Sequence, residues 1–310
     1  AGGRGTLEIR AMTDEGYPPD IAAAVTASPA TIGPIIPPSL PMIIYGVSAE
    51  ASIGDLFLGG VVPGLLMAVA LMIMVRAIAL RRNLPRVPFP GARDVWLAFK
   101  GAFWALLCPV VLFGGMMSGY FTATESAAVA AFYALVVGLG YGEFRVRDLP
   151  RIVLDTVETT GVMMALVMSA ALLAYALSLS RLPQNFGGWL TQTVSSPIMY
   201  LILVNVILLI VGCFMEAIAA MLILIPILVP PALALGIDPI QFGVVVVLNL
   251  MIGTITPPVG IVLFVTARVA NLPFAAVVRA TLPFLWPLLA VLVAITFVPA
   301  LTTWLPGVMR

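Results

Sequence analysis

The sequence GTITPPVG, residues 253–260, interrupts a long apolar stretch that extends from about residue 240 to about residue 270. Proline inside a helix lacks the donor N–H and clashes with the carbonyl four residues back, and glycine permits non-helical dihedral angles. We therefore expect two half-helices joined by an unwound segment near the middle of the stretch. Pro257 is expected to free the carbonyl of Gly253, and Pro258 that of Thr254.

A second break of the same kind, GPIIPPS at residues 33–39, interrupts an apolar stretch over residues 20–46. A shift of 220 residues superposes the two breaks without a gap, and it also pairs Gly16 with Gly236, Pro19 with Pro239, and Pro63 with Pro283. We expect Pro37 and Pro38 to free the carbonyls of Gly33 and Pro34. Two matched breaks indicate two equivalent units, and they favour a binding site over a pair of kinked packing helices.

The composition places the chain in a membrane. Of its 310 residues 62% are hydrophobic and 9% charged, with a mean hydropathy of +1.14, whereas a soluble domain carries about a quarter of its residues as charges. Zero histidines and two cysteines exclude zinc hydrolases and Cys/His metal clusters, and a net charge of +1 gives no indication of nucleic-acid binding. Further spans are expected at residues 56–80, 95–118, 122–142, 155–180 and 282–305, with interfacial segments at 143–154 and 183–195.

Residues 197–235 are apolar but interrupted at 212–217, so they form either one span or a hairpin of two arms. The hairpin places every Lys and Arg except Arg181 and Arg310 on one face, which the positive-inside rule assigns to the cytoplasm. It also gives the two broken helices opposite directions, so we predict an all-α integral membrane protein with an inverted repeat. The expected parts are residues 1–80 (first repeat, transport half), 81–180 (connection and three scaffold helices) and 181–310 (second repeat, transport half). By the repeat, three spans and the first arm of hairpin one would precede residue 1.

Candidate ion and substrate ligands gather at the two breaks and at the predicted hairpin tip. Unpaired carbonyls beside hydroxyls suit a hard cation such as sodium, and the N-termini of the following half-helices, at residues 39–42 and 259–262, suit an anion. The candidate site residues are Ser28, Thr31, Gly33, Pro37, Ser39, Gly212, Glu216, Asn249, Gly253, Thr254, Thr256 and Pro257. Among them, Gly253, Thr256 and Glu216 are the candidate sodium ligands, and none of the candidates is catalytic.

Three of the polar residues have a simpler interpretation beside the functional one. Glu216 is either a cation ligand or proton carrier, or an acid solvated in a cavity. Asn249 either supplies an amide oxygen or makes a helix–helix hydrogen bond. Glu125 follows Thr122 with the spacing of a capping box, so we predict a helix cap there.

The motifs together resemble the large membrane subunit of tripartite ATP-independent periplasmic (TRAP) transporters of the DctM type. The resemblance covers essentially the whole chain and rests on Gly16-Tyr17, residues 22–28 (AAAVTAS), 33–39, 63–66 (PGLL), 119–125 (GYFTATE), 236–239 (GIDP), Asn249-Leu250 and 256–260. It implies a sodium-driven importer of organic acids, such as C4-dicarboxylates or sugar acids, with an elevator-type movement in the bacterial inner membrane. The implied partners are a small membrane subunit, a periplasmic binding protein and the lipid bilayer, with sodium as coupling ion and no cofactor. Two features differ from the family: the first hairpin tip would precede Gly5, and Arg10 stands where proline is usual.

Two other functions are alternatives to the transporter subunit: a stand-alone symporter and an intramembrane enzyme. A stand-alone sodium or proton/carboxylate symporter of similar inverted-hairpin architecture would share these motifs. An intramembrane protease needs a nucleophile with a base or two opposed membrane aspartates, which the sequence does not offer. The substrate itself stays open.

Overall fold

The computed structural model describes residues 2–85, 91–118, 120–180 and 196–309, and this part of the chain is helical without a strand. Seven of its helices are long and apolar enough to cross a membrane: α4 (Ile53–Arg81), α5 (Ala92–Met117), α6 (Ala123–Tyr141), α7 (Leu149–Leu179), α9 (Pro197–Phe214), α10 (Ala217–Ala234) and α13 (Phe274–Phe297). The predicted class, an all-α integral membrane protein, is therefore confirmed.

The chain divides into two compact units. Residues 86–169 form one unit, with α5, α6, the short 3-10 helix η2 (Val146–Asp148) and most of α7. In this unit Thr122 and Glu125 form the predicted capping box: the Thr122 amide donates to Glu125 Oε2 at 2.8 Å, and the Glu125 amide donates to Thr122 Oγ1 at 3.3 Å. Glu125 therefore stabilises the start of α6.

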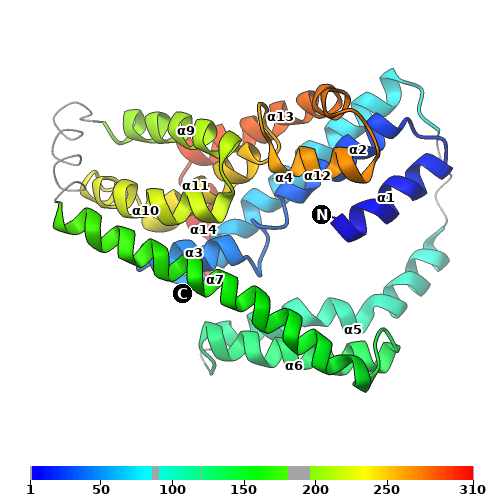
Figure 1. Cartoon of the computed structure of the whole chain (residues 1–310), viewed down its shortest axis with the longest axis horizontal. Coiled ribbons are helices and arrows are strands. Elements are labelled where there is room, and N and C mark those ends of the chain that lie inside the picture. Colours follow the sequence, from blue (N-terminus) through cyan, green and yellow to red (C-terminus); the bar gives the residue numbers. More distant parts are fainter. Residues whose placement is uncertain (1, 86–90, 119, 181–195, 310) are drawn as a thin grey trace. The chain divides into compact units, whose positions relative to one another are not determined.

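Residues 1–85 and 170–310 form the other unit, which contains both helix breaks. Besides α4, α9, α10 and α13 it holds α1 (Gly2–Asp14), α2 (Pro19–Ala27), the 3-10 helix η1 (Pro29–Thr31), α3 (Leu40–Ser48), α11 (Pro239–Gly253), α12 (Ile261–Val269) and α14 (Ala300–Met309). Its core is centred on α11, of which every residue from Ile240 to Gly253 is buried. Helices α9 and α10 pack beside α11 (Figure 1).

The interrupted apolar region 197–235 is a helical hairpin. Its arms, α9 and α10, have 18 residues each and are joined by only Met215 and Glu216. The hydroxyl of Tyr200, near the start of α9, donates to the carbonyl of Leu228, in the second half of α10, at 2.6 Å. The arms are therefore antiparallel, and the tip lies within the predicted residues 212–217.

The repeat is visible in the backbone. Gly16 and Gly236 both have positive φ, at 88° and 75°, and each ends a helix just before a proline-initiated one, α2 or α11. The Pro37–Pro38 and Pro257–Pro258 peptide bonds are both cis. After each break comes a short helix, α3 or α12, and the second residue beyond its end, Glu50 or Asn271, has a φ of 52°.

The predicted register of the repeat is wrong beyond the breaks. Ser39 is the N-cap of α3 and Gly260 is the N-cap of α12, so from these residues onward the shift is 221 and not 220. Val259 is the extra residue. As a consequence, Pro63 corresponds to Phe284 and its predicted pairing with Pro283 is a coincidence of proline-rich helices.

Equivalent helices make equivalent contacts. Helix α2 packs on α1 and α13, and its counterpart α11 packs on α10 and α4; likewise α12 contacts α1 and α2, and α3 contacts α10 and α11. Helices α4 and α13 are themselves a pair. One cavity between them is lined by the end of α4 and the first half of α13, and the adjoining cavity by the middle of α4 and the second half of α13. The two helices are therefore antiparallel, as an inverted repeat requires.

Two predicted boundaries need correction. The last span was expected at residues 282–305, but α13 covers Phe274–Phe297 and a separate helix, α14, follows, because Pro273 caps the start of α13 and Pro299 prevents its continuation. Residues 149–154 of the expected interfacial segment belong to α7, with Pro150 in its first turn, where proline is favourable. The segment predicted at 183–195 lies outside the described residues.

Candidate functional site

The second break joins α11 to α12 through residues 254–260. The Gly253 carbonyl accepts a hydrogen bond from the Thr256 amide at 3.0 Å, and the Thr254 carbonyl accepts one from the Val262 amide at 3.1 Å. The expectation that Pro257 and Pro258 leave these carbonyls unpaired is therefore wrong. The chain folds back after the prolines, so amides from the loop and from α12 replace the missing helical donors. Each carbonyl oxygen keeps a second lone pair for a ligand.

The tip of the hairpin meets this break in a backbone-to-backbone contact. A Cβ atom on Gly253 would lie 2.6 Å from the Cα of Gly212, closer than side chains ever approach, so the contact requires glycine. The Gly260 amide also donates to the carbonyl of Cys213 at 3.3 Å. Gly212 and Gly253, both predicted site residues, are thus brought together.

Hydroxyl and amide oxygens lie beside this contact. Thr254 and Thr256 donate their hydroxyl protons to the carbonyls of Met251 and Ile252, at 2.6 and 2.7 Å, which leaves lone pairs on both hydroxyl oxygens. Asn249, one turn earlier in α11, is fully buried, and its Oδ1 has no hydrogen-bond partner. An unpaired buried amide oxygen costs on the order of 1–3 kcal/mol, which a bound ligand would offset.

Asn205 in α9, which is not among the predicted site residues, is the hydrogen-bond partner of Asn249. The Asn249 Nδ2 group donates to the carbonyl and to Oδ1 of Asn205, at 3.0 and 2.7 Å. Asn205 in turn donates to the Leu201 carbonyl at 2.8 Å and to Thr296 Oγ1 at 3.1 Å, and so links the hairpin to α11 and α13. An asparagine inside the apolar α9 was the available signal for this contact. The helix–helix hydrogen bond considered for Asn249 is present.

Glu216 lies at the hairpin tip, as predicted, but its carboxylate caps a helix. Its side chain is exposed, and Oε2 accepts a hydrogen bond from the Ala219 amide at 3.0 Å at the N-terminus of α10. The carboxylate therefore has a structural partner of its own. No group of three or more His, Cys, Asp or Glu residues that could hold a metal occurs in the described ranges.

The first break carries three buried hydroxyls that bond to nearby carbonyls. Ser28 donates to the Ala24 carbonyl and Thr31 to the Ser28 carbonyl, both at 2.8 Å. Ser39 donates to the Pro34 carbonyl and accepts from the Met42 amide as the N-cap of α3. The predicted free carbonyl of Pro34 therefore also has a partner, and the α3 N-terminus is capped by a side chain of this chain.

A cavity of about 430 Å³ lies between the first break and α12. Gly33 lines it from the break, Val262 and Thr266 line it from α12, and Glu8 from α1. Thr26 also lines it, and the Thr26 hydroxyl is buried without a hydrogen-bond partner. Thr26 and Thr266 were not predicted as site residues, because a hydroxyl inside an apolar helix is ordinarily satisfied by its own helix.

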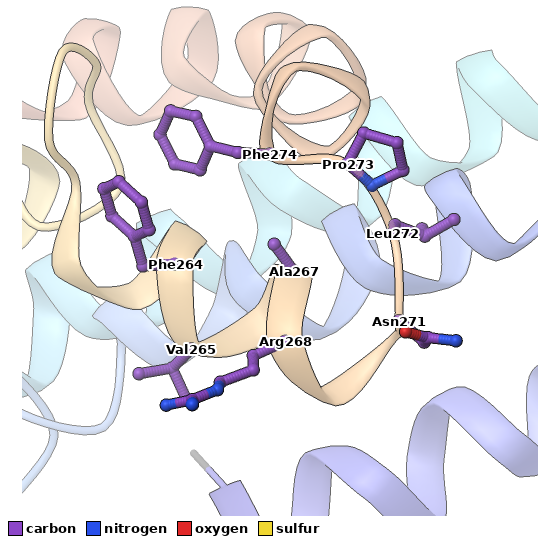
Figure 2. Close-up of a pocket in the computed structure, with 8 residues that line it drawn as sticks. All are labelled: Phe264, Val265, Ala267, Arg268, Asn271, Leu272, Pro273 and Phe274. Atoms are coloured by element: carbon purple, nitrogen blue, oxygen red, sulfur yellow. The ribbon is translucent and has the colours of Figure 1, made fainter.

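None of the described residues that line this cavity is an arginine. Arg268 instead lines a separate cavity of about 690 Å³ at the turn between α12 and α13 (Figure 2), together with Asn271. There the rings of Phe264 and Phe274 stack with centroids 4.2 Å apart. Thr266 of α12 lines the smaller cavity and Ala267 and Arg268 line the larger one.

Comparisons with known proteins agree with this architecture. The family model "Tripartite ATP-independent periplasmic transporter, DctM component" matches residues 2–301. The chain is 43% identical to the sialic acid TRAP transporter large permease protein SiaM of Vibrio cholerae, over 99% of this chain and 72% of that protein. It is also 43% identical to the C4-dicarboxylate TRAP transporter large permease protein DctM of Pseudomonas aeruginosa, over 98% of this chain and 71% of that protein. The chain is 42% identical to the 2,3-diketo-L-gulonate TRAP transporter large permease protein YiaN of Escherichia coli, over 95% of this chain and 70% of that protein.

These relatives are transporter permeases and not enzymes, so the intramembrane protease is excluded. Proteins of this family are multi-pass proteins of the inner membrane, and they work with a small membrane subunit and a periplasmic binding protein. The chain, with its matched helix breaks and its hairpin, belongs to the DctM family of large TRAP transporter permeases.

Proposed function

We propose that this chain is the permease of a sodium-driven importer of organic acids, with a sodium ion at the contact between the second break and the hairpin tip. The observation that carries the proposal is the approach of Gly212 to Gly253, because it brings the break, with its oxygens, against a second element. The candidate ligands are the carbonyl of Gly253 and the hydroxyl of Thr256. Broken helices with unwound carbonyls are typical sodium sites of secondary transporters.

The substrate is proposed to bind in the cavity of about 430 Å³ between the first break and α12. This volume lies in the usual range for small-molecule sites. The cavity reaches the first turn of α12 at Val262, where the helix dipole favours an anion, and the Thr26 hydroxyl offers a free hydrogen-bonding group. The named substrates of the three relatives, sialic acid, C4-dicarboxylates and 2,3-diketo-L-gulonate, are all organic acids.

Uptake into proteoliposomes tests the function. The full-length permease, reconstituted with its small subunit, is given a panel of radiolabelled organic acids with the cognate binding protein, at fixed pH, with an inward gradient of sodium or of choline. We expect uptake of at least one acid that requires both sodium and the binding protein. Equal uptake with choline would contradict sodium coupling, and uptake driven by a pH gradient in choline would assign the coupling to protons. Uptake without the binding protein would favour the stand-alone symporter.

A further inference from the structure

A continuous groove runs between α4 and α13, away from both helix breaks. It consists of two cavities, of about 440 and 610 Å³, which share the lining residues Met74, Ala77 and Trp286. The lining positions of α4 from Leu66 to Arg81 follow one face of that helix. Over 15 residues this face is about 22 Å long, more than half of the roughly 30 Å hydrocarbon thickness of a bilayer.

Most of the groove is apolar and open. The larger cavity is lined by aliphatic residues together with Trp286 and Pro287. The Trp286 side chain is 74% exposed, and Ile73 on the opposite wall is 64% exposed. Exposed apolar surface of this length in a membrane-spanning unit suits an apolar neighbour, such as a lipid acyl chain.

One end of the groove is strongly basic. Arg81, Arg82 and Arg279 line the smaller cavity, beside Ala280 and Pro283. Arg82 is paired with Asp20 at 3.3 Å, and this is the one ion pair found among the described residues. Within the described part of the chain Arg81 and Arg279 therefore have no carboxylate partner, and this end of the groove keeps an excess of positive charge.

We propose that this groove binds an anionic phospholipid, with the headgroup phosphate between Arg81 and Arg279 and one acyl chain along α4 and α13. The charge complements a phosphate, and the apolar continuation complements an acyl chain, which inorganic phosphate does not have. The positive-inside rule assigns these arginines to the cytoplasmic side, where anionic lipids meet basic pockets between helices. The proposal is independent of the ion and substrate sites, whose residues lie on other elements or faces.

Native mass spectrometry of the full-length permease with its partner components tests the proposal. The detergent-purified complex is titrated with phosphatidylglycerol and with phosphatidylcholine of the same acyl chains. We expect the wild type to retain phosphatidylglycerol preferentially, and the double variant Arg81→Gln/Arg279→Gln to weaken its binding by about fivefold for each arginine. Ala290→Trp, which places a bulky ring in the apolar part, should weaken both lipids. Arg76→Gln, a neighbouring exposed arginine of α4 outside the groove, is the matched control and should change nothing.

Equal retention of the two lipids by the wild type would overturn the proposal, as would an effect of Arg76→Gln as large as that of the double variant. Insensitivity to Ala290→Trp, combined with displacement of phosphatidylglycerol by inorganic phosphate, would reduce the site to a phosphate site and also overturn it. A photoactivatable cross-linker on a cysteine at Ala70, in a background without Cys108 and Cys213, identifies the occupant in membranes. Cross-linking to lipid supports the proposal, and cross-linking to a protein helix in place of lipid refutes it.

Discussion

At the scale of single residues, the least expected feature is Thr26, whose buried hydroxyl has no partner and lines the proposed substrate cavity. Thr26→Val keeps the shape of the side chain and removes the hydroxyl. Because no hydrogen bond within the protein is lost, we expect the thermal stability to be unchanged or raised. Loss of a hydrogen bond to the substrate should weaken the apparent affinity by about five- to tenfold, which initial uptake rates measure.

Two substitutions serve as controls for Thr26→Val. Thr303→Val removes a hydroxyl of α14 that donates to the Pro299 carbonyl, far from the cavity in sequence, and should leave affinity unchanged. Arg268→Gln removes the basic residue of the larger cavity and should also leave affinity unchanged. A selective loss of affinity in Arg268→Gln, with wild-type affinity in Thr26→Val, would move the substrate site to the cavity of Figure 2.

The Gly212–Gly253 contact gives a second prediction at this scale. Gly253→Ala would place its Cβ 2.6 Å from Gly212, so the hairpin tip must shift. We expect a loss of stability of about 1–3 kcal/mol and a larger loss of sodium-driven uptake. Gly307→Ala, whose Cβ meets nothing within 4 Å, is the control. Wild-type melting temperature and uptake in Gly253→Ala would show that the close approach has no functional role.

The sequence predicted which residues stand at the breaks but not what they bond to. Glycine and proline shape the backbone by themselves, so Gly212, Gly253 and the Pro-Pro pairs could be identified directly. The new donors for the Gly253 and Thr254 carbonyls come from the chain after the prolines, at Thr256 and Val262, and depend on how it turns. Thr26 and Asn205 were missed for the same reason, because their roles depend on which helix packs against them.

At the scale of elements, the hairpin α9–α10 decides the topology, and labelling of single cysteines tests it. In a background without Cys108 and Cys213, cysteines at Ser196 and Ala234, at the open end of the hairpin, should both react with an impermeant thiol reagent added from the periplasmic side. A cysteine at Ala275, in the first turn of α13, should react only from the cytoplasmic side. Labelling of Ser196 and Ala234 from opposite sides would contradict the hairpin and the inverted repeat together.

Boundaries of elements were predicted less well than their existence. A hydropathy pattern identifies the apolar part of a membrane-spanning helix. The start of α13 at Phe274 is set instead by Pro273, and it lies outside the apolar core of the span. The register of the repeat was also predicted wrongly, because the second break has one extra residue, Val259. It shifts α3 against α12 by one position, which the many glycines and prolines of both units conceal from a gapless comparison.

At the scale of the whole molecule, the distribution of the arginines and the contacts between the two repeats both fit an inverted repeat in the membrane. The positive-inside rule predicts that Arg81, Arg82 and Arg279 lie on the same face of the membrane, and in the structure these three residues line one cavity. The reciprocal contacts of α1, α2, α3 and α4 with α10, α11, α12 and α13 fit a two-fold relation between the repeats. Proposed sodium and substrate sites near the breaks match the usual location of such sites in inverted-repeat transporters, at the interface of the repeats.

The most direct test is the sodium dependence of uptake in Thr256→Ala, in the full-length permease assembled with its partners. Thr256 contributes a hydroxyl oxygen beside the contact of the second break with the hairpin tip, and its own hydrogen bond, to Ile252, is made within the chain at 2.7 Å. We predict a several-fold higher sodium concentration for half-maximal uptake, with normal membrane insertion and with Glu216→Gln close to wild type because that carboxylate caps α10. Unchanged sodium dependence in Thr256→Ala and Gly253→Ala alike would contradict a sodium site at this contact.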